Sequence, residues 1–293
     1  RRRHTRSLCD GSSDVCSSDL GPKDNRQVPF RIGDPAHPPP PTFVIATLRA
    51  LPTVFSIGLQ RQLAYRWNYL LRALFSAMPL LVSWVFWQAA FRERETVGAY
   101  TLPGLLTYYA ILLIVEAVSS PADDDFQISR EIREGMLNPI LLRPLPYGLY
   151  RFFLFLAGRC AYFTAAIVPV LLCFVLLSRA VPLELANLDP WRGLPALLGS
   201  ALLQFSLTLC LSLTSFWFLD ISALIFLVYS LEFLAGGHVF PLDLLPAPLF
   251  SVVRLLPFAY EYWFPTAALC GTLSHPAWVA GLCLQFRSEE HTS

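Results

Sequence analysis

The chain has 293 residues, of which 55% are hydrophobic and 15% are charged, and its net charge is +1. Its mean hydropathy is +0.50. This composition is too apolar for an ordinary soluble domain and indicates an integral membrane protein, and the near-zero net charge gives no sign of a nucleic-acid partner.

The sequences of the two ends indicate an origin different from that of the middle of the chain. Residues 287–293 read RSEEHTS, and residues 14–20 read DVCSSDL. The DNA string AGATCGGAAGAGCACACGTCT encodes the first segment, its reverse complement encodes the second, and the string matches a common sequencing adapter. We therefore expect residues 1–20 and 287–293 to be adapter-derived, and the native protein to be interrupted at about Phe286.

A proline-rich leader and an amphipathic stretch precede the first apolar run. Residues 21–42 contain four consecutive prolines and no apolar periodicity, which predicts a disordered or extended leader before a body of residues 43–286. Farther on, Phe55, Leu59, Leu63 and Trp67 recur every four residues, with Arg61 on the opposite side. This pattern predicts an N-terminal helix in the membrane interface, with a simple extension of the first span as the alternative.

The apolar runs predict an all-α integral membrane protein with six spans. A helix needs about 20 apolar residues to cross a bilayer. The predicted spans are residues 69–91, 102–118, 161–178, 194–219, 221–235 and a sixth, truncated one at 277–286. Arginines are more numerous in the segments on the side of the N-terminus, which predicts that the N-terminus is cytoplasmic.

The segment between the second and third predicted spans is charged and rich in proline. Pro121 is well placed to begin a helix, residues 123–125 would put three aspartates in its first turn, and Gly135 would stop it. Asn138-Pro139 and Arg143-Pro144 then predict that residues 140–142 are extended rather than helical. An apolar tripeptide held at the cytoplasmic face is typical of a docking element, although an ordinary solvated linker is the alternative.

The segment after the fifth predicted span is apolar but broken by glycine and proline. Gly236-Gly237 permits a sharp turn, and four prolines divide residues 241–257 into short pieces. We expect a re-entrant or interface-lying hairpin on the outer side, which is possible at membrane depth only if it packs on protein. Tyr260, Tyr262 and Trp263 fit an aromatic belt at the membrane surface.

Two carboxyl groups fall within predicted spans. Buried ionisable groups are costly in a bilayer and suggest function, although hydration near an interface is the plain alternative. The candidate pathway or gate residues are Glu116, Glu232, Gly236 and Gly237.

Motifs for catalysis are missing from the sequence. A P-loop needs a lysine that contacts phosphate, and Lys23, in the leader, is the only lysine of the chain. We expect this chain to be no enzyme and assign no catalytic, cofactor-binding or metal residue. Residues 123–125 would suit Mg²⁺ and a diphosphate, as in membrane prenyl transferases, but we find no second acidic cluster. An ion-coupled secondary transporter is the other alternative, and it would need an internal repeat that we do not find.

Three segments in order resemble a known family. They are QLAYRWNYLL at residues 62–71, IREGMLNPILLRPLP at 132–146, and GGHVFPLDLLP at 236–246, followed by LLPF. Over residues 51–286 the chain resembles permease subunits of bacterial ATP-binding-cassette transporters of the type-2 exporter class. The resemblance implies a multi-pass permease of the bacterial plasma (inner) membrane, surrounded by lipid, whose cytoplasmic coupling helix docks on a separate ATPase.

The resemblance also implies partners and coupling residues. The partners would be a dimer of cytoplasmic ATPase subunits, which would bind ATP and Mg²⁺, and a second permease subunit, identical or related. The expected residues of the ATPase-coupling loop are Asp124, Phe126, Arg130, Glu131, Arg133, Glu134, Gly135, Leu141, Arg143 and Pro144.

Overall fold

The computed structural model describes residues 41–64, 67, 71, 74–75, 78–119, 124–142, 145–181 and 183–290. The side chains of residues 41–46, 63, 124, 180 and 287–290 are outside this description. Residues 1–20 and nearly all of the predicted leader, 21–42, lie outside the described residues, so their predicted origin and disorder stay predictions.

The described part of the chain is built from helices and contains no strand. The longer helices are α1 (Pro41–Ala64), α3 (Met78–Ala90), α4 (Leu102–Ser119), α5 (Asp124–Arg133), α7 (Tyr147–Ala180), α8 (Pro190–Leu213), α9 (Ser222–Ala235) and α13 (His275–Glu290). The short helices are α6 (Asn138–Leu141), α10 (Ala247–Val253), α11 (Phe258–Glu261) and α12 (Trp263–Leu269). Three 3-10 turns are η1 (Leu185–Asn187), η2 (Thr214–Phe216) and η3 (Leu242–Leu244).

Within the described residues, three helical segments are long and apolar enough to cross a membrane. They are Leu102–Ser119, Tyr147–Arg179 and Pro190–Phe216, and α3 and α9 are shorter apolar helices. The predicted all-helical membrane class is therefore confirmed, and the count of six spans stays a prediction. Helix α7 begins 14 residues before the predicted start at residue 161, and Pro146 precedes its first turn. Arg151 and Arg159 interrupt the apolar run in the sequence, but neighbouring elements bury both of them.

Helix α4 is the most buried of the long helices. It contacts α3, α7, α8 and α12, and Leu105, Leu106 and Val115 on it are fully buried. Helix α7 has the opposite character, since Val168, Leu172 and other large apolar side chains of its second half are exposed. A soluble protein rarely exposes so continuous an apolar surface, so we expect lipid to cover this side of α7.

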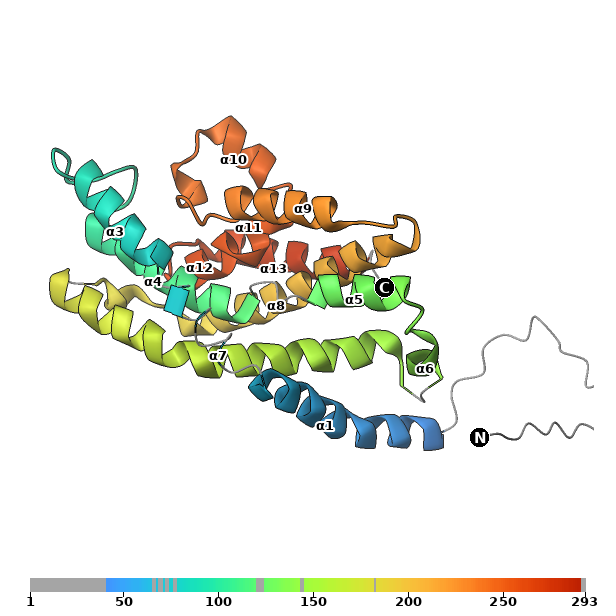
Figure 1. Cartoon of the computed structure of the whole chain (residues 1–293). Helices are drawn as coiled ribbons and strands as arrows, with labels where there is room; N and C mark the ends of the chain where they lie inside the picture. The colour runs from blue at the N-terminus through green and yellow to red at the C-terminus, as the bar shows by residue number, and fades with distance from the viewer. Residues whose placement is uncertain are drawn as a thin grey trace, which may run out of the picture. The chain divides into compact units, whose positions relative to one another are not determined.

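Helix α1 lies beside α7 (Figure 1) and packs on it through small residues. A Cβ atom at Gly58 would lie only 2.8 Å from the Cβ of Ala157, so the two backbones approach closely there. The buried face of α1 includes Val54 and Gly58, whereas Phe55 and Leu59 of the predicted stripe are half-buried at its side. Close contact through small residues is typical of helix pairs in membranes.

Helices α12 and α13 pack on a face of α8 that contains small residues. The side chain of Gln285 on α13 donates to the backbone oxygens of Ala196 (3.1 Å) and Tyr260 (2.9 Å), which joins α13 to α8 and α11. A Cβ at Gly199 would lie 2.6 Å from Oε1 of Gln285, so this contact requires the absence of a side chain. The packing of the C-terminal helices therefore depends on α8.

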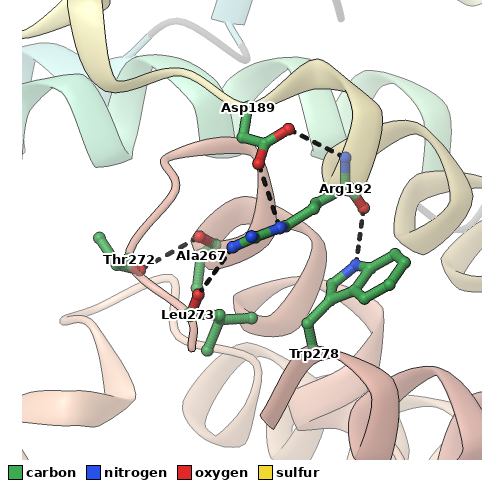
Figure 2. Close-up of polar contacts among 6 residues, drawn as sticks. All are labelled: Asp189, Arg192, Ala267, Thr272, Leu273 and Trp278. Carbon is green, nitrogen blue, oxygen red and sulfur yellow. Dashed lines mark hydrogen bonds and ion pairs between the residues drawn. The ribbon is translucent and has the colours of Figure 1, made fainter. Parts of the chain in front are cut away.

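The beginning of α8 is held by a polar network, shown in Figure 2. The side chain of Asp189 accepts a hydrogen bond from the backbone N–H of Arg192 (3.2 Å) and also pairs with its guanidinium group (3.2 Å). The same guanidinium group donates to the backbone oxygen of Leu273 (3.3 Å), and the indole of Trp278 donates to the backbone oxygen of Arg192 (2.9 Å). This network fixes the start of α13 against the start of α8.

Candidate functional site

Helix α5 forms where the sequence predicts a charged helix. It runs from Asp124 to Arg133 and is followed by Gly135, which has a φ of 69°. The backbone N–H of Met136 donates to the oxygen of Glu131 (2.9 Å), and that of Gly135 donates to Ile132 (3.2 Å). A left-handed glycine with these two bonds closes the carbonyl end of a helix, so Gly135 acts as the predicted stop.

The inner side of α5 is bonded to α7. The guanidinium group of Arg151, which is only 3% exposed, forms an ion pair with the carboxylate of Glu131. Arg151 also donates to the hydroxyl of Tyr147 (3.0 Å), and Gln127 donates to the other carboxylate oxygen of Glu131 (2.9 Å). Glu131 therefore faces the membrane domain and holds α5 in place, rather than pointing outward to a partner.

Two further polar contacts hold α5 to the turn after α8 and to α9. The buried carboxylate of Asp125 accepts a hydrogen bond from the hydroxyl of Tyr229 on α9. The hydroxyl of Ser215 in η2 donates to that of Ser129 on α5 (2.8 Å), and both side chains are buried. Helix α5 is thus bonded to α7, to the turn after α8 and to α9, although it is only 10 residues long.

The outer side of α5 is exposed. Phe126, Arg130, Arg133 and Glu134 are all exposed, and Arg133 donates to the backbone oxygen of Leu219 (2.9 Å). Leu219 belongs to an apolar turn, residues 216–219, that joins η2 to α9 and exposes all four of its side chains. The predicted fourth span, residues 194–219, includes residues 216–219, whereas helix α8 ends at Leu213 and these residues form a turn. The following Asp220 is the only signal for this turn in the sequence.

The expectation that residues 140–142 are extended is wrong. Residues Asn138–Leu141 form the short helix α6, with Pro139 in its first turn. Proline is tolerated there because the first N–H groups of a helix have no intrahelical partner, so Pro139 begins a turn rather than preventing one. Leu141 and Leu142 are exposed, whereas Arg143, Pro144 and the side chain of Asp124 lie outside the described residues.

The candidate pathway residues lie at different sites. Glu116 is half-buried and lines a small cavity of about 80 Å³ with Tyr109 and His238. Glu232 is 6% exposed, and one of its carboxyl oxygens accepts a hydrogen bond from the hydroxyl of Tyr262 (2.7 Å). The structure thus gives each carboxyl its own surroundings rather than one shared site.

Gly236 and Gly237 turn the chain after α9, and the following segment packs on α4. Gly237 has a φ of 90°, and a Cβ there would lie 2.7 Å from the hydroxyl of Tyr108, so a larger residue does not fit. Tyr108 donates to the backbone oxygen of Gly237 (3.0 Å) and Tyr109 donates to that of Val239 (2.7 Å). The glycines therefore shape a packed turn, as expected for a segment that rests on protein.

Tyr100 extends this contact toward η3. Its hydroxyl donates to the side chain of Asp243 (2.8 Å), and the indole of Trp263 donates to the same oxygen (3.3 Å). Burial, together with the nearby Asp243 carboxylate, raises the pKa of Tyr100 well above its usual value, so the hydroxyl remains a donor.

The aromatic-belt interpretation of residues 260–263 is wrong, and a buried acid among them was missed. Tyr260, Tyr262 and Trp263 are all nearly buried and belong to the main apolar core with α4 and α8. Between them, Glu261 is fully buried, and neither of its carboxyl oxygens has a hydrogen-bond partner. An acid inside an aromatic run is the sequence signal that could have identified it.

Comparison with known proteins identifies a family for most of the chain. The family model for the ABC-2 family transporter protein matches residues 77–286. No curated protein and no solved structure matches the chain. The matched range includes α5, the turn at residues 216–219 and the packed segment after α9.

Proposed function

Because the chain belongs to the ABC-2 family of transporter proteins, we propose that it is the permease of an ATP-binding-cassette exporter driven by a separate ATPase subunit. Its apolar helices and its family make it a multi-pass membrane protein and a membrane component of a transporter. The proposal adds the direction of transport, the ATPase and its place of contact. It also places the protein in a bacterial inner membrane with a cytoplasmic N-terminus.

The observation that carries the proposal is the two-sided character of α5. Its inner side is bonded to three other elements through Asp125, Ser129 and Glu131. Its outer side presents Arg130 and Glu134 to solvent, and Arg133 bonds it to the exposed apolar turn at 216–219. The exposed apolar residues of α6 follow α5 in the chain. An element with charged and apolar groups outside and rigid bonds inside suits the transfer of a partner's motion to the membrane helices.

The proposed docking surface consists of Phe126, Arg130, Glu134, Leu141 and Leu142 together with the turn at residues 216–219. It has apolar side chains for a buried interface centre and charges for its rim. Arg130 and Arg133 lie at this end of the structure, and an excess of arginine at one end favours the cytoplasmic side. The cytoplasmic ATPase dimer, which would hold ATP and Mg²⁺, contacts this surface.

In the proposed mechanism, closure of the ATPase dimer displaces α5. The ion pair with Arg151 passes the displacement to α7, and Tyr229 passes it to α9. Two permease subunits, identical or related, form the pathway between them. Since coupling free energy is reciprocal, a bound substrate alters the affinity of the permease for the ATPase.

The test is co-purification with an ATP-binding-cassette ATPase subunit that is co-expressed with this protein. The variant Arg130→Glu/Leu142→Asp should lower its recovery at least about tenfold, because it reverses a charge at the rim and puts a charge at the apolar centre, for a combined loss of about 2 kcal/mol. Membrane insertion should persist, since both side chains are exposed. The control Glu95→Arg changes an exposed charge in the loop after α3 and should bind normally. Equal recovery of the ATPase with the double variant and the control would refute the docking surface.

A further inference from the structure

A cavity of about 270 Å³ lies where the second half of α8 meets α9 and α11. Apolar side chains make much of its wall, among them Leu207 and Leu211 of α8, Val228 of α9 and Phe258 of α11. A cavity with an apolar wall and a few convergent polar groups is typical of a small-molecule site.

Two buried polar side chains of this cavity offer hydrogen-bond acceptors. Glu232 supplies a carboxyl group, and Gln204, which is 1% exposed, supplies a side-chain oxygen that has no hydrogen-bond partner. The amide nitrogen of Gln204 is already directed to the hydroxyl of Thr208 (3.4 Å). A buried acceptor without a donor costs about 1–3 kcal/mol, so the cavity favours a ligand that donates hydrogen bonds.

The ionisable groups around Glu232 are acids. Asp125 and Glu116 are close enough to act electrostatically on Glu232, and Glu232 and the buried Glu261 act on each other. A cluster of buried acids gives no favourable partner to an anionic ligand, whereas an ammonium group can donate hydrogen bonds to Glu232 and favours its ionised form. The ligand that fits the wall, the acceptors and the charge is an ammonium group on an apolar body.

We propose that the cavity lined by Gln204, Val228 and Glu232 binds a small apolar amine in its protonated form as the transported substrate. The assignment of the amine as a transported substrate rests on the proposed permease function, whereas the binding site itself does not. Tyr229 also lines the cavity, and its hydroxyl donates to Asp125 of α5. A bound amine therefore contacts a residue that holds the proposed coupling helix.

The test compares phenethylamine with 2-phenylethanol, which has nearly the same size and no charge at neutral pH. Equilibrium dialysis against the purified chain in lipid nanodiscs, with empty nanodiscs as background, measures both affinities. We expect the amine to bind at least about tenfold more tightly, since a charge-assisted hydrogen bond contributes about 1.5–3 kcal/mol. Equal affinities for the two compounds would overturn the proposal.

Four variants locate the site. Glu232→Gln should remove the preference for the amine, and Gln204→Leu should weaken amine binding severalfold. Val228→Phe should fill the cavity and abolish binding of both compounds. This variant tests the site independently, in case Glu232→Gln folds poorly. The control Glu184→Gln changes an acid of a different cavity, where it accepts a hydrogen bond from Thr101 (2.6 Å), and should leave the preference intact. Retained preference in Glu232→Gln, wild-type binding in Val228→Phe, or loss in the control would each overturn the site.

The dialysis assay and the co-purification assay test the two proposals independently. Dialysis needs no ATPase, so a chain that retains its ATPase but shows no amine preference overturns the substrate class alone. A chain that binds the amine but never co-purifies with the ATPase overturns the permease assignment and leaves the cation site standing.

Discussion

The ion pair between Glu131 and Arg151 should determine how firmly α5 is held. The pair is nearly buried, with side-chain exposures of 15% and 3%, so removing one partner leaves an uncompensated charge. Breaking a buried pair costs about 3–5 kcal/mol, and the partial exposure of Glu131 favours the lower end. A loss of about 3 kcal/mol corresponds to a change of more than a hundredfold in the opening equilibrium of α5.

Hydrogen–deuterium exchange of the peptide that covers residues 124–133 measures this opening equilibrium. Arg151→Met keeps much of the length of the side chain and its contact with the rings of Tyr147 and Tyr150, but removes the charge. We expect exchange to become about a hundredfold faster in this variant. The control Arg179→Met removes an exposed charge from the other end of α7 and should change nothing.

A double-mutant cycle separates the ion pair from general damage. Glu131→Gln alone should accelerate exchange less, because an amide oxygen still accepts a hydrogen bond from Arg151. The combined variant Glu131→Gln/Arg151→Met leaves no buried charge and should exchange more slowly than Arg151→Met alone, with a coupling energy of about 2 kcal/mol. Additive effects of the two changes would refute the reasoning, since they would mean that the charges do not stabilise each other.

Three further changes test the packing of the membrane helices. Gly237→Ala puts a Cβ on a residue with a φ of 90° and should lower the melting temperature in detergent by about 4–8 °C, whereas an unchanged melting temperature would contradict the required turn. Gly58→Leu should push α1 away from Ala157 and make residues 41–64 at least about tenfold more sensitive to protease, and the exposed control Ser56→Leu should not. Asp189→Ala removes the cap of α8 and should speed exchange in its first turn about fivefold, for a loss of about 1 kcal/mol, whereas unchanged exchange would show that the cap is not needed.

Local signals in the sequence predicted α5 well. Acidic residues in the first turn and Gly135 at the end are short-range features, and each acts within one or two turns of its own position. The predicted role of Pro121 at the helix start lies outside the described residues. The apolar runs likewise predicted the membrane class and the helices around α4, α8 and α9. The start of α7 was misjudged because Arg151 and Arg159 interrupt the apolar pattern, and only tertiary packing reveals that both are buried.

The roles of individual side chains in the candidate site depend on distant partners. Both the sequence and the structure put Glu131 on a charged helix. Its inward direction follows from its ion pair with Arg151, which is 20 residues away. Glu261 is isolated from other acids in the sequence and comes near Glu232 only through the packing of α11 on α9. Pro139 shows the converse error. The conformational restriction of a residue before proline predicted an extended segment, but Asn138 and Pro139 form the first turn of α6.

The close contact of α1 with α7 has a consequence for the surrounding bilayer. At Gly58 and Ala157 the backbones of α1 and α7 are so close that one helix cannot move along the other without a clash. We therefore expect the two helices to move together. Arg151, which holds α5, lies on the same helix as this contact. A push delivered to α5 would then displace lipid along α1, and the thickness and viscosity of the membrane would enter the rate of the transport cycle.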